Sequence, residues 1–426
     1  MPESYIPTYS TKFVRTVTMC IHISPVCNLN CKYCFKKQSE GDLTIADVQR
    51  FIDCVLQVYP HADRYIVDMS GAGEPLLRKD LLFKIARYCK TLSDKHLREF
   101  LPTIVTNGTL LTEQVVNELQ SEGVLFGVSL DGTRDAHNKN RVFQNGDGSY
   151  DIIEKNIRGI KHKDFVGAAL TYSGADLLQS FLSAFKLLPT VSMKPVRYTD
   201  GNELDADAIC ASYDELVEFV LNKLLNADTS YTYALLNGDD YFGKFLRRVT
   251  LNVNVLGRCD AGIGRFALAG DKKIYCCPAA AHIDGGIVGD LENGINQSKI
   301  RLMWSKLYNT MCGGCEASGA CGGECKIVSY NRYGNFDGID SIMCKIKRHI
   351  YGLAKRFVAV LADTRPDMLE WLKETCSKVE SYYDKDDALI NAVKLSQGQY
   401  KYSEMKKIKD TKPELFRELY AKLINS

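Results

Sequence analysis

Between Thr16 and Ala227, short apolar runs alternate with longer amphipathic segments. Six runs of strand length lie at Val17–Ile23, Tyr65–Met69, Pro102–Thr106, Leu125–Leu130, Val166–Leu170 and Met193–Arg197. Segments with helical periodicity follow them, at Ile45–Val58, Lys79–Lys90, Glu113–Gln120, Ile152–Lys161, Leu177–Leu187 and Tyr213–Leu225. This alternation predicts an α/β fold whose parallel strands are covered by helices on one side. The sheet is either open and twisted or curved into a partial (β/α)6 barrel, and we expect the barrel.

Loops rich in glycine, cysteine or polar residues follow four of the predicted strands. Cys27–Cys34 follow the first strand, Ser70–Pro75 the second and Thr106–Gly108 the third, while Ser129–Gly132 end the fourth. Functional groups of parallel α/β folds gather at the carboxyl ends of the strands. One glycine-rich turn is usually only a turn, but four such loops at one rim favour a functional site.

Cys27, Cys31 and Cys34 have the spacing C-x3-C-x2-C. Three thiolates match a [4Fe–4S] cluster that leaves one iron for another ligand. A structural zinc site normally uses four nitrogen or sulfur ligands. The zinc alternative therefore needs His22 or a distant residue as its fourth ligand.

Cysteine is frequent and unevenly distributed along the chain. Of 16 cysteines, three lie between Cys27 and Cys34 and eight between Cys259 and Cys344. No apolar signal segment precedes the first strand and no stretch is long enough to cross a membrane, so we expect a cytosolic protein with reduced thiols. Clustered thiols then indicate metal ligands, and a net charge of +2 gives no general attraction to nucleic acid or membranes. The isolated cysteines are expected to be small buried residues, namely Cys20, Cys54, Cys89, Cys210 and Cys376.

Together these motifs resemble those of the radical S-adenosylmethionine (SAM) enzymes. The cysteine spacing after the first strand and the sequence Ser70-Gly-Ala-Gly-Glu74-Pro75 after the second carry the likeness. The stretch from Ser129 through His137 and Arg141 to Tyr150 is similar to the subgroup with a cysteine-rich C-terminal domain, the SPASM group. The resemblance extends from about Val17 to Ile350.

The resemblance implies SAM and a first [4Fe–4S] cluster as cofactors, with Cys27, Cys31 and Cys34 as cluster ligands. SAM would chelate the free iron, and its reductive cleavage would yield a 5′-deoxyadenosyl radical that abstracts a substrate hydrogen. The glycine turn would meet the methionine amino group, Ser129 and Arg141 the ribose and carboxylate regions, and the Tyr33 backbone the adenine. The implied SAM-binding residues are thus Tyr33, Gly71, Ala72, Gly73, Glu74, Ser129 and Arg141. The sequence identifies no catalytic side chain.

After about Asp228 the strand–helix alternation stops, and Phe266–Ala269 with Lys273–Tyr275 predict a β-hairpin. Here the resemblance implies a domain with two auxiliary [4Fe–4S] clusters, which makes three clusters in all. Its implied ligands for the outer cluster are Cys312, Cys315, Cys321 and Cys344. Those for the inner cluster are Cys259, Cys325 and one of Cys276 and Cys277, of which we favour Cys277. Two structural zinc sites are the alternative.

Two departures from the family pattern bear on function. Some members supply an extra inner-cluster ligand at the position of Arg265, so one iron here is open unless Cys276 fills it. Sulfatase-maturating relatives carry an aspartate base just after the hairpin cysteine, whereas Pro278-Ala-Ala-Ala cannot accept a proton. The second departure disfavours sulfatase maturation. An open iron that binds a substrate cysteine favours thioether formation.

We divide the chain into an N-terminal segment (1–15), a radical SAM partial barrel (16–228), a SPASM domain (229–350) and a helical extension (351–426). An apolar stripe predicts one amphipathic helix packed on the cluster domain, formed by Ile346, Ile350, Leu353, Phe357, Val360 and Leu361. Two or three further helices are expected between Pro366 and Ser426.

We expect an oxidoreductase that modifies a ribosomally made precursor peptide by a thioether or carbon–carbon crosslink or a related change. Its expected partners are that peptide, an electron donor such as flavodoxin or ferredoxin, and a separate leader-peptide-binding protein unless the tail or the cleft takes this role. Three alternatives remain: a maturase of a whole protein, a radical enzyme for a small molecule, and an iron–sulfur electron-transfer protein. An electron-transfer protein would not need the glycine-rich loop Ser70–Pro75, because it has no use for a SAM-binding site.

Overall fold

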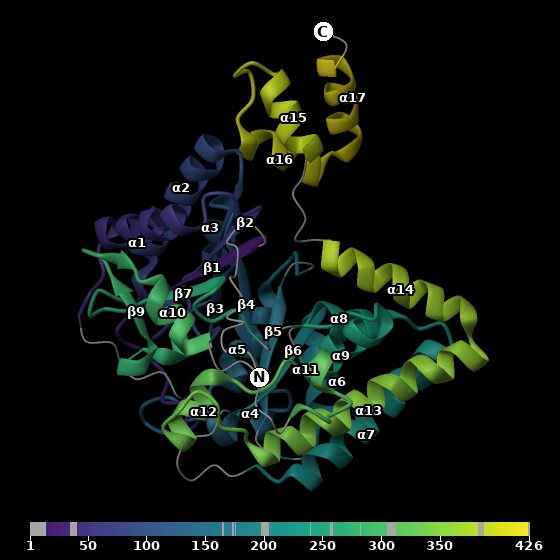
Figure 1. Ribbon diagram of the computed structural model, residues 1–426. Helices are drawn as coiled ribbons and strands as arrows, with labels where there is room; N and C mark the ends of the chain where they lie inside the picture. The colour runs from purple at the N-terminus through teal and green to yellow at the C-terminus, as the bar shows by residue number, and fades with distance from the viewer. Residues whose placement is uncertain are drawn as a thin grey trace, which may run out of the picture.

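The computed structural model describes residues 14–34, 41–163, 166–172, 174, 176–196, 204–238, 240–255, 259–281, 283–304, 312–381 and 387–424. One sheet of ten strands runs through them, in the order β10-β9-β8-β7-β1-β2-β3-β4-β5-β6. Helices surround this sheet, and a small helical unit stands at one end of the molecule (Figure 1).

Six strands form the parallel part of the sheet and follow one another in chain order. They are β1 (Thr16–Ile21), β2 (Arg64–Asp68), β3 (Glu99–Thr106), β4 (Leu125–Ser129), β5 (Gly167–Tyr172) and β6 (Thr190–Pro195). Each pairs in parallel with the next. The predicted parallel α/β fold is therefore confirmed. Among the described strands β6 ends the sheet on one side, so the six do not close into a full barrel.

Helices follow these strands: α1 (Ile45–Val58), α2 (Lys79–His96), α3 (Glu113–Ser121), α4 (Arg134–Asn140), α5 (Tyr150–Gly159), α6 (Leu177–Leu187) and α7 (Ala206–Leu225), with the 3-10 turn η2 (Pro75–Arg78) before α2. The bounds of α1 and α6 agree with the prediction. The prediction for β6 was wrong at its start, which is Thr190 and not Met193, and its predicted end, Arg197, lies outside the described residues. The short, polar helix α4 was not predicted because it has no apolar stripe.

The cysteine-rich region continues the same sheet. Its strands are β7 (Arg265–Leu268), β8 (Lys273–Tyr275), β9 (Ile287–Asp290) and β10 (Gly294–Ile295), with the 3-10 turns η3 (Pro278–Ala280) and η4 (Asp284–Gly286). The predicted hairpin is confirmed, because β7 and β8 pair antiparallel. In addition β7 pairs in parallel with β1, which places Arg265 beside Thr18. The first strand of the molecule thus joins the two regions.

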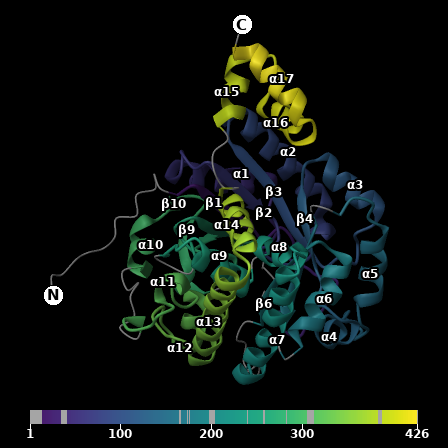
Figure 2. The same cartoon turned by 90° about the vertical axis from the view of Figure 1, so that its right-hand side faces the viewer.

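Six more helices complete this part: α8 (Ser230–Asn237), α9 (Tyr241–Thr250), α10 (Gln297–Trp304), α11 (Ser318–Cys321), α12 (Lys326–Tyr333) and α13 (Ser341–Thr364). The long helix α13 packs across α7 and α9. The predicted amphipathic helix is confirmed in α13, since Ile346, Ile350, Phe357 and Leu361 are fully buried. In Figure 2, α3 and α5 lie toward one end of the sheet and α10–α12 toward the other.

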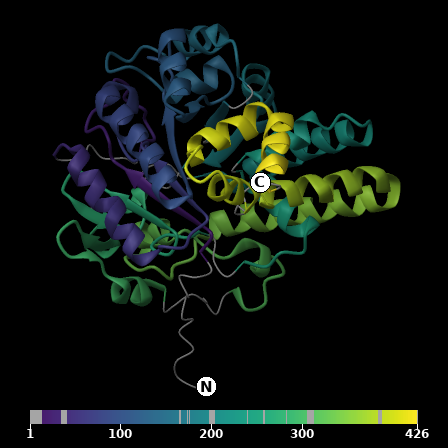
Figure 3. The same ribbon diagram turned by 90° about the horizontal axis from the view of Figure 1, so that it is seen from above.

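The C-terminal region contains four helices within its described residues, not the two or three that were predicted: α14 (Pro366–Ser381), α15 (Asp387–Leu395), α16 (Tyr402–Thr411) and α17 (Pro413–Ile424). The last three share an apolar cluster of their own, around Leu389, Met405 and Phe416. This unit contacts α2, where the Ser403 N–H donates to Asp94 Oδ1 at 2.9 Å. Figure 1 shows the unit beside α2, and Figure 3 looks down onto it.

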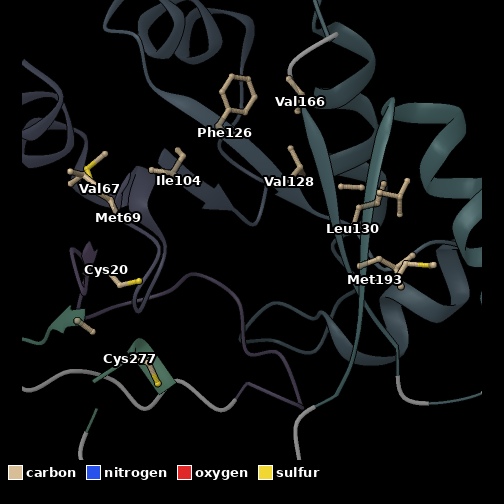
Figure 4. Close-up of a cluster of buried hydrophobic side chains, with 14 of the residues drawn as sticks. Cys20, Val67, Met69, Ile104, Phe126, Val128, Leu130, Val166, Met193 and Cys277 are labelled. Atoms are coloured by element: carbon tan, nitrogen blue, oxygen red, sulfur yellow. The ribbon is translucent and has the colours of Figure 1, made fainter. Parts of the chain in front are cut away.

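The main apolar core runs without interruption from β1–β6 into the cysteine-rich region. Figure 4 shows part of it, with Val67, Ile104 and Val128 from the neighbouring strands β2, β3 and β4, and with Cys20 and Cys277. Of the isolated cysteines, Cys20, Cys89, Cys210 and Cys376 are buried as expected, while Cys54 is partly exposed. No helix in the described part of the chain combines the length and the apolarity that crossing a membrane requires.

Phe357→Ala is expected to lower the free energy of unfolding by about 3–5 kcal/mol, because the ring is fully buried and its loss leaves a cavity. This ring packs edge-on against Phe242, with 5.7 Å between centroids, and so joins α13 to α9. Denaturant unfolding measures the effect. Tyr233→Ala, which removes a ring that is 51% exposed on α8, is the matched control and should change stability little. Equal losses of unfolding free energy in both variants would contradict the conclusion that Phe357 holds α13 against α9.

Candidate active site at the rim of the parallel strands

Backbone hydrogen bonds hold the cysteine loop after β1 against the segment that follows α4. The Asn30 N–H donates to the Val142 carbonyl at 2.7 Å. Within the loop, the Cys34 N–H donates to the Cys31 carbonyl at 3.0 Å and closes a turn. The thiols are therefore positioned by main-chain geometry at the carboxyl end of the first parallel strand.

The three thiols of this loop affect one another electrostatically. Burial raises the pKa of Cys27, and the nearby Cys34 adds to the rise. Burial also raises the pKa of Cys31 to about 11, although the positive charge of Arg141 opposes it. Three converging soft sulfur donors fit the irons of a [4Fe–4S] cluster. Their assignment as its ligands stays a prediction.

The zinc alternative finds no support in the part of the chain that the structure describes. His22, its suggested fourth ligand, lies against Gly71, because a Cβ on that glycine would be 2.3 Å from His22 Cδ2. Among the described residues no three His, Cys, Asp or Glu side chains are grouped as ligands of a single metal ion. The irons of a cluster hold their thiolates farther apart than one ion does, so this finding leaves the cluster assignment open.

The glycine turn after β2 lies directly on the backbone that leads into the cysteine loop. The Gly71 N–H donates to the Ile21 carbonyl at 3.0 Å, and the Glu74 N–H to the Val26 carbonyl at 2.9 Å. Gly73 has φ +64°, and a Cβ there would lie 2.3 Å from the Ser24 carbonyl oxygen. Only glycine tolerates such a close approach. The structure thus brings the predicted SAM turn and the predicted cluster loop together.

Gly71→Ala should weaken SAM binding at least roughly tenfold and lower stability by about 1–3 kcal/mol. Its Cβ would be 2.7 Å from the Ile21 carbonyl oxygen, so the turn must move. Equilibrium dialysis with labelled SAM and urea unfolding measure the two effects. Gly159→Ala on α5 is the control, because nothing lies within 4 Å of that Cβ. Unchanged SAM affinity in Gly71→Ala would remove this turn from the proposed site.

Glu74 is buried and ties the ends of β2 and β3 together. Its Oε1 accepts from the Thr106 hydroxyl at 2.7 Å, and its Oε2 from the Asn107 N–H at 2.8 Å. The Asn107 amide in turn donates to Cys27 Sγ at 3.8 Å and to Asn28 Oδ1 at 2.8 Å. This carboxylate therefore organises the rim around the first cysteine.

A buried carboxylate, Asp131, joins the cysteine loop to β4 and β5. Its Oδ2 accepts from Arg141 Nε at 2.9 Å and from the Tyr33 hydroxyl, and its Oδ1 accepts from the Thr171 N–H at 2.9 Å. The Arg141 guanidinium also lies over the Tyr33 ring, 5.4 Å from its centroid. Burial disfavours the charge of Arg141, but Asp131 and Tyr33 raise its pKa on balance. Arg141 is therefore a fixed cation beside Cys31.

An uncharged histidine, His137, forms hydrogen bonds that hold Asp131 and Arg141 in place. Burial lowers the pKa of His137 to about 4, so the ring is uncharged near neutral pH. Its Nδ1 accepts from the Asp131 N–H at 3.2 Å, which leaves Nε2 to donate to Ser149 Oγ at 3.0 Å. The Ser149 hydroxyl donates to the Arg141 carbonyl at 2.9 Å. This chain of hydrogen bonds fixes the backbone of Arg141.

The structure places the predicted SAM-binding residues at one rim. Gly71, Ala72, Gly73 and Glu74 follow β2, Ser129 ends β4, and Tyr33 and Arg141 meet at Asp131. Their contacts with SAM stay predictions. Sequence reasoning missed Asn107 and Asp131 as parts of the site, although both stand in loops that the strand-end rule had singled out.

A second group of thiols lies in the cysteine-rich region. Burial raises the pKa of Cys259 to about 11, with further contributions from Cys325 and Cys277. A hydrogen bond with Cys277 and burial raise the pKa of Cys276. All four candidate inner ligands therefore converge. Cys259, Cys277 and Cys325 line a cavity together with Cys321, a candidate ligand of the outer cluster, whereas Cys276 does not line it; the choice between Cys276 and Cys277 stays a prediction.

The third group contains the four cysteines predicted for the outer cluster. Burial raises the pKa of Cys312 and of Cys344, and the group's other thiols, Cys315 and Cys321, add to both rises. Cys344 stands in the first turn of α13, and Lys347 on the next turn forms a buried ion pair with Glu324 at 2.9 Å. These placements are compatible with two auxiliary clusters, whose number and ligands stay predictions.

A cavity of about 260 Å³ lies beside the inner thiols. Its walls come from the end of β6 (Lys194–Val196), from α9, from the turn Pro278–Ala279 and from the start of α12. It thus connects the rim of the parallel strands with the cysteine-rich region. Pro278 and Ala279 give it no proton acceptor at the position where sulfatase-maturating relatives are expected to carry one.

Comparison with known proteins agrees with this arrangement. Residues 21–174 match the family model of the radical SAM superfamily. The chain is 25% identical to the AdoMet-dependent heme synthase of Methanosarcina barkeri, over 73% of this chain and 91% of that one. It is 28% identical to a cysteine-type anaerobic sulfatase-maturating enzyme of Clostridium novyi, over 31% of this chain but only 37% of the relative. The fold is similar to native anSMEcpe with bound AdoMet and Cp18Cys peptide, with TM-score 0.65, 19% identity and coverage of 82% and 99%.

Proposed function

Because residues 21–174 of this chain form a radical SAM domain, we propose that the protein is a SPASM-type enzyme that modifies a ribosomally made peptide. When bound, the first cluster and SAM supply a 5′-deoxyadenosyl radical that removes a hydrogen atom from the substrate. The proposed product is a crosslink, either a thioether or a carbon–carbon bond. A one-electron donor such as flavodoxin or ferredoxin would reduce the clusters.

In this proposal the chain's own residues have three tasks. Cys27, Cys31 and Cys34 hold the first cluster, and the glycine turn positions the methionine end of SAM next to it. Asp131 keeps the cysteine loop in place through Tyr33 and Arg141.

The observation that carries the proposal is the cavity between the rim and the inner thiols. It is lined by three cysteines that are candidate ligands of one cluster and by side chains from β6 and α9. A peptide side chain that enters it would lie beside the candidate ligands of the inner cluster. A substrate cysteine there could bind an open iron, which favours a thioether as the product.

The relatives support a peptide substrate in part. One is named for maturing sulfatases, and the similar structure holds a peptide together with AdoMet. Pro278-Ala279-Ala280 lacks the aspartate that sulfatase maturation would use, so the proposed modification differs from that reaction.

A second candidate is a radical enzyme for a small molecule. The alignment with the heme synthase favours it, because it covers 73% of this chain and 91% of that protein. Such an enzyme would form 5′-deoxyadenosine with a heme precursor and not with a peptide.

The test combines the anaerobically reconstituted full-length chain with SAM, dithionite and synthetic cysteine-containing precursor peptides from neighbouring genes. Mass spectrometry should find a product that has lost one pair of hydrogens and, after fragmentation, a link between two residues. Parallel reactions contain a heme precursor in place of the peptide. Formation of heme without any change in the peptide would replace the proposal by the second candidate.

A further inference from the structure

A buried ion pair lies between the inner and the outer thiol groups. Lys347 Nζ donates to Glu324 Oε2 at 2.9 Å, and the two side chains are only 4% and 5% exposed. Two charges that leave water lose their hydration, so a buried ion pair often adds little to stability compared with apolar residues of similar size. Its position between two groups of thiols therefore points to a role other than stability.

The carboxylate of this pair lies beside the inner group. Glu324 directly precedes Cys325, and its Oε1 accepts from the Cys325 N–H at 2.7 Å. Cys325 is also the N-cap residue of α12, and it lines the same cavity as Glu324 and Cys259. A negative charge is thus fixed next to a candidate ligand of the inner cluster.

The ammonium group lies beside the outer group. Lys347 follows Cys344 by three residues on α13, so the two lie on the same side of the helix. Its Nζ also donates to the Gly323 carbonyl at 3.3 Å, and that oxygen lies 3.6 Å from Cys321 Sγ. Burial raises the pKa of Cys312 and of Cys344, and the positive charge of Lys347 opposes both rises. The lysine thus favours the thiolate form in the outer group.

The surrounding structure fixes the direction of the ion pair. The segment Cys321–Cys325 supplies one candidate ligand to each group, and Lys347 binds it at two points, Gly323 and Glu324. A second ion pair joins the same two helices, because Arg332 of α12 pairs at 2.8 Å with Asp340, the N-cap residue of α13. The positive end therefore stays toward the outer thiols and the negative end toward the inner ones.

We propose that Lys347 and Glu324 are positioning residues that separate the reduction potentials of the two auxiliary clusters. Positive charge beside a cluster stabilises its reduced form, and negative charge beside it stabilises its oxidised form. The pair therefore raises the potential of the outer cluster relative to that of the inner one. The inference rests on the proposed function, because it requires both auxiliary clusters.

A redox titration of the anaerobically reconstituted full-length chain, followed by electron paramagnetic resonance, tests the proposal. Cys31→Ala and Cys312→Ala, which should lack the first and the outer cluster respectively, assign the signals. In the double variant Lys347→Gln with Glu324→Gln, neither residue leaves an unpaired charge. The one-electron equilibrium between the auxiliary clusters should shift about tenfold toward reduction of the inner one. This shift equals about 59 mV in the difference between their potentials.

Lys347→Arg retains the charge and should keep the native difference between the two potentials. Arg356→Gln is the control on the same helix, because it removes a cation from an exposed ion pair with Glu218 and should change neither potential. Circular dichroism and iron content show whether each variant is folded and loaded. An unchanged difference in the double variant, or an equal shift in Lys347→Arg, would overturn the proposal.

Glu324→Gln alone gives a second measurement, because it keeps a hydrogen-bond acceptor for Lys347. The potential of the inner cluster should then rise more than that of the outer one. Loss of an auxiliary cluster in both this variant and the double variant would show a structural role only and would overturn the proposal.

The titration also separates this inference from the proposed function. Absence of auxiliary signals from a native chain with a complete first cluster would overturn the cluster content of the proposed function. Two auxiliary signals whose potentials do not respond to the pair would keep the proposed function and overturn the inference.

Discussion

Cys31→Ala is expected to lower the iron content of the reconstituted chain by about four of roughly twelve atoms and to bring 5′-deoxyadenosine formation below detection. The physical reason is that a cluster with two thiolate ligands is not held in place. Iron analysis, the ultraviolet–visible spectrum and chromatography of the nucleoside products measure the change. Auxiliary clusters should remain, because their proposed thiols lie on other elements.

Cys54→Ala is the matched control for this experiment. Cys54 is a partly exposed cysteine on α1 and belongs to none of the three thiol groups. Its loss should leave both the iron content and the activity unchanged. Full activity in Cys31→Ala would show that the loop after β1 is not the radical site.

Asp131→Asn is expected to lower the free energy of unfolding by about 3–5 kcal/mol, because it leaves the buried guanidinium of Arg141 without a carboxylate. The Tyr33 hydroxyl loses an anionic acceptor at the same time. Since Tyr33 stands between Cys31 and Cys34, the variant should also bind the first cluster poorly. Denaturant unfolding and iron content measure the two effects.

Asp151→Asn removes a carboxylate from an exposed ion pair with Arg134 and is the control for Asp131→Asn. Its effect on stability should be small, because solvent screens the pair. If the two variants were equally stable and equally loaded with iron, Asp131 would not organise the cysteine loop.

Local periodicity predicted the order of the strands and most helices in the parallel half of the molecule, but it missed α4, ended α2 too early and began β6 and α7 too late. The bounds of α1 and α6 follow from apolar residues at helical spacing, and the order of β1–β6 follows from the rule that sequential strands with crossover helices lie side by side. The same rule placed Cys31, Gly71 and Ser129 at one rim. These features depend on short stretches of sequence, and the pattern of apolar and polar residues within such a stretch can predict them.

Long-range pairing was beyond the sequence patterns. The parallel contact of β7 with β1 joins residues such as Thr18 and Arg265, and no local signal marks it. The same holds for Asp131, whose partners Tyr33 and Thr171 come from distant loops and strands. Such contacts arise from packing, which one sequence does not reveal.

The choice between Cys276 and Cys277 illustrates the same limit. The cysteine spacing did not distinguish Cys276 from Cys277, because adjacent residues are separated from every other cysteine by nearly the same number of residues. Both residues follow the end of β8 at Tyr275, so strand alternation does not distinguish them either. Both cysteines pack in the apolar core, and of the two only Cys277 also lines the cavity.

The central claim is that this chain generates a 5′-deoxyadenosyl radical at the loop of Cys27, Cys31 and Cys34 and uses it on a peptide. The most direct test follows SAM cleavage by the reconstituted chain with a precursor peptide deuterated at its side chains. Deuterium should appear in 5′-deoxyadenosine, only with reductant present and not in Cys31→Ala. Peptide crosslinking without deuterium transfer, or no SAM cleavage by a chain with a complete first cluster, would contradict the claim.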